Sequence, residues 1–140
     1  MTTLTRTPDT SALADGTRFL RTVIRLDAVV TGLAGLMLLA TGLGAVENLS
    51  GIPLAFQTGG GAFLIAFAAG GLVLASRPRI PRGLVWAMVV VNAVWVVDCA
   101  VVLVADLMPL TAFGLVMMIG QAVVVAVFAE LEYIGLRKTR

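Results

Sequence analysis

Four long apolar stretches dominate the chain, and its charged residues are confined almost entirely to the segments between them. Residues 28–46, 48–76 and 107–129 contain no Asp, Glu, Lys or Arg, and residues 83–105 contain one, Asp98. A helix needs about 20 mostly apolar residues to cross the hydrocarbon core of a bilayer. Because open sheet edges cannot face lipid and these stretches are too long for barrel strands, the pattern predicts four transmembrane helices.

The loops between the stretches are short, and this organises the whole chain. Short connections make consecutive helices antiparallel neighbours. The predicted fold class is therefore all-α, a four-helix transmembrane bundle with up-down topology. Residues 1–16 are polar and lack apolar periodicity, so we expect a flexible N-terminal tail, followed by a single domain over residues 17–140. The expected helices cover about 20–46, 53–76, 83–105 and 109–133.

Composition supports a membrane protein, and the distribution of charge predicts its orientation. Hydrophobic residues make up 59% of the chain and charged residues 13%, against about 45–50% and about 25% in soluble domains. All basic residues precede the first stretch, lie in the middle loop, or follow the last stretch, which predicts that both termini are cytoplasmic. Glu130, Glu132 and Tyr133 are expected on a solvated rim at this side. The basic residues are Arg6, Arg18, Arg21, Arg25, Arg77, Arg79, Arg82, Arg137, Lys138 and Arg140.

Polar residues inside the predicted spans form a candidate intramembrane site. At a rise of about 1.5 Å per residue, they converge near the membrane midplane from three helices, and Asn92 and Trp95 share one helix face. The glycines of "TGGGAF", residues 58–63, lie at a comparable depth and are expected to form a packing surface. The candidate site residues are Asp98, Asn92, Gln121, Thr41 and Trp95.

Structural and functional interpretations compete for these residues. Asn92 and Gln121 are typical of interhelical hydrogen bonding as well as of ligand binding. Asp98 differs from these two residues, because placing a charged side chain at the bilayer centre costs at least about 2.5–3.5 kcal/mol. Such residues commonly mark an ion or proton path. No Lys, Arg or His is available at its depth. It is therefore either a neutral, hydrogen-bonded structural acid or a group that titrates in contact with water or a cation.

The composition also excludes several kinds of chemistry. The chain has no histidine, which excludes a Ser-His-Asp triad and imidazole metal sites. Lys138 is the only lysine and Cys99 the only cysteine, so a buried Schiff-base lysine and a dithiol redox pair are also excluded. We therefore predict no enzymatic activity, no catalytic residues, no cofactor and no metal. A soluble basic face for nucleic acid is absent as well.

Three segments of the chain resemble a group of small bacterial four-helix integral membrane proteins to which no reaction is assigned. They are "LDAVVTGLAGLMLLATGLG", "VVVNAVWVVDCAVVLVAD" and "TAFGLVMMIGQAVVVAVFAELEYIGLRK", and the likeness covers residues 20–138. Its most distinctive elements are the Asn92 and Trp95 pair, Gln121 and the ending "FAELEYIGLRK". The resemblance implies a multi-pass protein of the bacterial inner membrane. The predicted architecture is also similar to that of DoxX-like four-helix proteins.

Two functional hypotheses follow from the sequence. In the first, which we favour slightly, the chain is a non-enzymatic membrane protein that acts through helix packing, as a homo-oligomer or as an accessory subunit of a membrane complex. In the second, it is a small proton- or cation-coupled transporter or channel that uses Asp98 at the midplane. The expected partners are the lipid bilayer and further copies or other membrane subunits.

Overall fold

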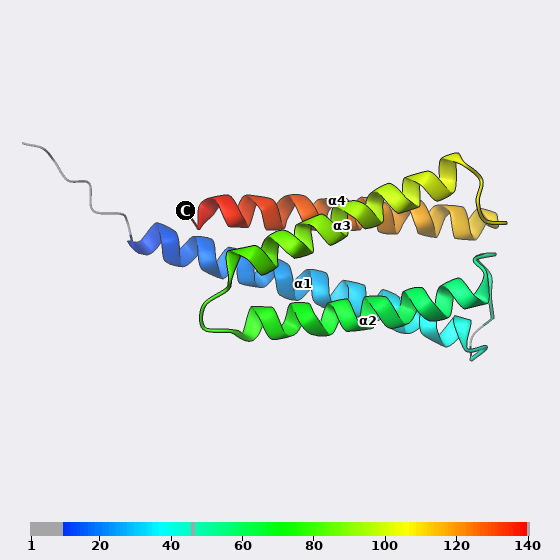
Figure 1. Cartoon of the computed structure of the whole chain (residues 1–140), viewed down its shortest axis with the longest axis horizontal. Helices are drawn as coiled ribbons and strands as arrows, with labels where there is room; N and C mark the ends of the chain where they lie inside the picture. The colour runs from blue at the N-terminus through cyan, green and yellow to red at the C-terminus, as the bar shows by residue number, and fades with distance from the viewer. Residues whose placement is uncertain (1–9, 46, 140) are drawn as a thin grey trace, which may run out of the picture.

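The computed structural model describes residues 10–45 and 47–139, which form four helices (Figure 1). No strand occurs in these two ranges, so the expected all-helical, four-helix architecture is confirmed. Each helix is long and apolar enough to cross a membrane, as expected of a multi-pass membrane protein. The helices are α1 (Thr10–Gly42), α2 (Leu54–Ser76), α3 (Arg82–Val104) and α4 (Ala112–Lys138).

Two helices extend further than their apolar patterns predict. The helix α1 begins at Thr10, inside the segment expected to be a flexible tail, and residues 1–9 of that segment lie outside the described residues. Gly16 is buried against the end of α4, where an added Cβ would lie 2.6 Å from the carbonyl oxygen of Lys138. The helix α4 continues past residue 133 because Gly135 and Leu136 are buried on that same contact. The two polar helix ends therefore support each other.

The helices pack as a chain of pairs, with α2 on α1, α1 on α4, and α4 on α3. Glycines allow the closest of these approaches. A Cβ added at Gly35 would lie 2.9 Å from the Leu64 Cβ, and one added at Gly61 would lie 2.6 Å from the Leu39 backbone nitrogen. No larger residue fits there without separating α1 from α2. Within the described ranges α2 and α3 are not a closely packed pair, which leaves a seam between them.

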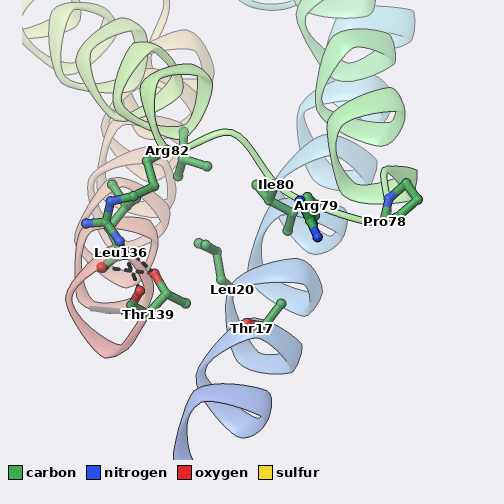
Figure 2. Close-up of a pocket in the computed structure, with 9 residues that line it drawn as sticks. Thr17, Leu20, Pro78, Arg79, Ile80, Arg82, Leu136 and Thr139 are labelled. Atoms are coloured by element: carbon green, nitrogen blue, oxygen red, sulfur yellow. Dashed lines mark hydrogen bonds between the residues drawn. The ribbon is translucent and has the colours of Figure 1, made fainter. Parts of the chain in front are cut away.

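Hydrogen bonds show which segments meet at each end of the bundle. At one end, Arg82 Nη1 donates to the Thr139 carbonyl oxygen at 3.2 Å, and Arg21 donates to the carbonyl oxygens of Ala75 and Pro78. The start of α1, the α2–α3 loop and the end of α4 thus lie together, and we call this the basic end (Figures 1 and 2). At the opposite end, the α1–α2 loop contacts the start of α4, where the Thr111 hydroxyl donates to the Leu49 carbonyl oxygen at 2.6 Å.

The buried core is divided into two apolar layers. The layer near the basic end contains seven buried residues: Leu20, Ile24, Leu74, Ala75, Val85, Met88 and Leu136. The layer toward the opposite end contains Cys99, Met108 and Met118. Asn92 on α3 and Glu132 on α4 lie between these layers along their helices, and Asp27 of α1 is buried with them. The core thus encloses a polar site that α1, α3 and α4 build together.

Candidate functional site

The polar site between the two apolar layers is a hydrogen-bonded group of Asp27, Thr31, Asn92 and Glu132, which we call the carboxyl cluster. Asn92 Nδ2 donates to Asp27 Oδ2 at 3.1 Å and to Glu132 Oε2 at 3.4 Å. Thr31 Oγ1 donates to Asp27 Oδ1 at 3.0 Å. Asp27 and Glu132 are both 0% exposed. One amide therefore joins two buried carboxyl groups, and through them it links three helices.

Local sequence explains why these side chains point inward. In α1, buried residues recur at spacings of three and four through Ile24, Asp27 and Thr31, so Asp27 belongs to the helix face that packs on the bundle. Glu132 precedes buried Gly135 and Leu136 by three and four residues on α4. Both carboxyl groups extend the apolar stripes of their helices and are buried with them.

One polar atom of the carboxyl cluster has no hydrogen bond within the cluster. Glu132 Oε1 is buried and has no hydrogen-bond partner among the described residues. Within the same residues, neither carboxyl group is ion-paired to an Arg or Lys side chain. An unpartnered buried polar atom costs about 1–3 kcal/mol, and two carboxylates side by side repel each other when both are ionised. The arrangement is therefore suited to hold a proton between the two groups.

Of the residues that the sequence analysis singled out, Asn92 belongs to this cluster and three others gather elsewhere. Trp95, Asp98 and Gln121 line a cavity of about 430 Å³ toward the opposite end of the bundle. Residues of all four helices contribute to this cavity, which lies at the seam between α2 and α3, and we call it the seam cavity. Its lining is mainly apolar, with Phe56, Met118 and the backbone of Gly60 among its other members.

The surroundings of these side chains differ. Asp98 is exposed and has no hydrogen-bond partner within residues 10–45 and 47–139. The Trp95 ring stacks on Phe63 of α2, with ring centroids 6.2 Å apart and an interplanar angle of 8°. Gln121 Nε2 lies 3.8 Å from the Cys99 Sγ, at the limit of a hydrogen bond to sulfur. The seam cavity therefore has one carboxyl group, one amide and one aromatic wall.

Thr41 lies apart from both the carboxyl cluster and the seam cavity. Its side chain is buried, and its Oγ1 donates to the Met37 carbonyl oxygen of its own helix at 3.0 Å. The structure thus distributes the five candidate residues over three places instead of one.

Sequence reasoning missed Asp27 and Glu132 as members of the site. Glu132 was expected on a solvated rim with Glu130 and Tyr133, and it is instead fully buried, whereas Glu130 and Tyr133 are exposed. The physical reason is the length of α4, which carries Glu132 inside the bundle by continuing to Lys138. The signal in the sequence was the spacing of Asp27 and Glu132 with their apolar neighbours at three and four residues.

Comparison of the chain with known protein families, with characterised proteins and with solved structures gives no match. The likeness to small four-helix membrane proteins is supported by the four apolar helices alone, and no similarity to DoxX-like proteins is found. Function must therefore be argued from the cluster, the cavity and the surface of this chain.

Proposed function

We propose that the chain is a non-enzymatic membrane protein that acts through helix packing, as a homo-oligomer or as an accessory subunit of a membrane complex. The observation that carries this proposal is the position of Asp98, which is exposed on α3 beside the seam. Exposed apolar side chains surround it along the helix, including Val94, Val97 and Val101. A carboxyl group thus stands on a surface that is otherwise suited to lipid.

Energetics favour a protein surface over lipid at this position. A charged side chain in the hydrocarbon core is costly, by at least about 2.5–3.5 kcal/mol at its centre, and a helix packed across the seam would remove Asp98 from hydrocarbon. The neighbouring face of α2 permits close approach at Gly60, which lines the seam cavity and has no side chain. The carboxyl cluster also favours assembly, since its hydrogen bonds join α1, α3 and α4 into one folded unit against which a partner can pack.

Cysteine cross-linking tests this assembly. In a Cys99→Ala background, Val101→Cys places a thiol near Asp98, and we expect it to form an intermolecular disulfide in membranes if a second copy covers the seam. The matched control is Val124→Cys, which replaces another exposed valine, on α4. Equal cross-linking at both positions would indicate random collision and would contradict the proposal. If another subunit covers the seam, a photoreactive residue at Val101, which needs no thiol on the partner, instead links to a protein of different mass.

Substitution of Asp98 separates its role in assembly from its role in folding. Asp98→Leu should reduce the oligomer or the co-purified complex in mild detergent, because a partner helix could no longer donate hydrogen bonds to this carboxyl group. It should leave the unfolding of the monomer unchanged, since the side chain has no partner within the described residues. A chain that remains monomeric in both wild type and variant, with no co-purified subunit, would refute assembly.

The orientation that we propose places both termini and the α2–α3 loop in the cytoplasm of a bacterial cell. The support is the distribution of basic residues, which cluster at the basic end of the bundle. A cysteine at Asn48 should react with an impermeant reagent in intact cells, and one at Arg79 should not. The reverse labelling pattern would invert the orientation.

The seam cavity favours a second candidate function, a small proton- or cation-coupled transporter or channel. A cavity of about 430 Å³ with Asp98, Gln121 and an aromatic wall could receive a cation or small cationic solute. In proteoliposomes, Asp98→Asn should abolish flux while Asp106→Asn, a carboxyl change at an exposed site outside this cavity, should not. Absence of wild-type flux for protons, alkali cations and organic cations would remove this candidate.

A further inference from the structure

A second cavity, of about 300 Å³, lies at the basic end of the bundle and belongs to neither site described above. It is bounded by the start of α1, the α2–α3 loop, the start of α3 and the end of α4 (Figure 2). We call it the basic cavity. Two arginines, Arg79 and Arg82, line it, and no Asp or Glu is among the described residues around it. The described lining therefore carries a formal positive charge.

The rest of the lining makes the basic cavity amphipathic. The hydroxyl-bearing side chains of Thr17 and Thr139 line it together with the arginines, and both threonines are half-buried. Leu20, Val85 and Leu136 supply an apolar floor, and they are 3%, 0% and 1% exposed. A ligand that fits this lining carries an anionic group at one end and an apolar part at the other.

Hydrogen bonds hold the two arginines differently. Arg82 Nη1 donates to the carbonyl oxygen and to Oγ1 of Thr139, at 3.2 Å and 3.1 Å, so its guanidinium is fixed beside the end of α4 (Figure 2). The loop that carries Arg79 is held on α1 by Arg21, which donates to the Pro78 carbonyl oxygen at 3.4 Å. Arg79 itself has no hydrogen bond, ion pair or ring contact within the described residues, and all its donors are available.

We propose that the basic cavity binds the phosphate group of an anionic glycerophospholipid. Guanidinium groups make strong, charge-assisted hydrogen bonds to phosphate oxygens, often in pairs, so Arg79 and Arg82 would hold the phosphate. The glycerol backbone and first methylenes would lie over Leu20 and Leu136. Two features favour a lipid over a free anion. The floor is apolar, and, with the basic end on the cytoplasmic side as in the proposed orientation, such basic pockets between membrane helices are suited to anionic headgroups.

Two loop arginines provide a matched test. Arg77 and Arg79 are both exposed and stand in the same loop, but only Arg79 lines the basic cavity. Arg79→Gln and Arg77→Gln therefore remove the same charge from the same loop. Binding of phosphatidylglycerol to the purified full chain would be measured by native mass spectrometry and by titration in detergent. Phosphatidylcholine, glycerol 3-phosphate and inorganic phosphate would be the comparison ligands.

We expect Arg79→Gln to weaken phosphatidylglycerol binding on the order of fivefold or more, and Arg77→Gln to change it by less than about twofold. Wild type should prefer phosphatidylglycerol to phosphatidylcholine. Equal losses in both variants would show general attraction to a basic surface and overturn the proposal. Glycerol 3-phosphate or inorganic phosphate binding as tightly as the lipid would show a free-phosphate site instead. Unchanged helicity and thermal unfolding of both variants establish that the comparison is between folded proteins.

Discussion

The hydrogen bonds of Asn92 hold the carboxyl cluster together, so replacing this residue by leucine should destabilise the bundle measurably. Asn92→Leu places an apolar side chain of similar shape in the core and removes the amide that donates to both Asp27 and Glu132. Interhelical hydrogen bonds in membrane proteins contribute about 0.6 kcal/mol on average and up to about 1.7 kcal/mol. Loss of two such bonds gives an expected destabilisation of about 1–3 kcal/mol, because the buried Glu132 carboxyl loses its amide donor.

Equilibrium unfolding in mixed micelles, with an increasing fraction of a denaturing detergent, would measure this loss. Gln121→Leu is the matched control, because the Gln121 side chain is only half-buried and makes one long contact, at 3.8 Å to Cys99 Sγ. It should cost less than about 0.6 kcal/mol. A double-mutant cycle of Asn92→Leu with Glu132→Leu should show coupling of about 0.5–1.7 kcal/mol. Equal losses for Asn92→Leu and Gln121→Leu, or no coupling in the cycle, would refute the reasoning.

Three further changes probe the packing around the site, each by thermal or detergent unfolding. Gly61→Ala should destabilise the bundle by about 1–3 kcal/mol, because its Cβ would lie 2.6 Å from a backbone nitrogen of α1, whereas Gly59→Ala should stay within about 0.5 kcal/mol. Thr111→Val should cost about 1 kcal/mol, since this hydroxyl accepts from the first turn of α4 at 3.0 Å and donates to the α1–α2 loop. Arg21→Ala should destabilise more than Arg25→Ala, because Arg21 donates to the carbonyl oxygens of Ala75 in α2 and Pro78 in the α2–α3 loop, and Arg25 is exposed. Losses of equal size at Gly59 and Gly61, or at Arg21 and Arg25, would contradict these assignments.

The number of helices could be predicted from the sequence because hydrophobicity along the chain is a one-dimensional property. The gaps in charge correspond to α1, α2 and α4, and α3 was identified despite Asp98. Their ends were less predictable. Gly16 of α1 packs on Lys138 at the end of α4, a contact between segments far apart in the chain that supports both helix ends. Polar residues near helix ends give no apolar signal for such a contact.

Which residues form the carboxyl cluster could not be predicted from the sequence pattern of a single helix. Azimuth within α3 separates Asn92 from Asp98, but only the arrangement of neighbouring helices decides which face is enclosed. Asn92 faces α1 and α4, where Asp27 and Glu132 meet it, while Asp98 faces the open seam beside α2. The depth of Glu132 was misjudged because α4 was expected to end near residue 133. The helix continues to Lys138, so Glu132 lies six residues inside it.

The carboxyl cluster and the seam cavity differ in how easily they can be reached from outside the bundle. This difference bears on whether the chain acts through assembly or through transport. The carboxyl groups of Asp27 and Glu132 are completely enclosed, so ions can reach them only if α1, α3 or α4 move apart. Asp98 is accessible at the seam without any movement, and a partner helix could cover it directly. Assembly thus requires only the surface that the folded chain already presents. Transport requires in addition a path from the seam cavity through the apolar layer near the basic end, and the Asn92 hydrogen bonds next to that layer hold three of the four helices together. The same interactions that make the bundle a stable unit for packing therefore oppose the motion that a carrier would need, which is why the geometry favours assembly.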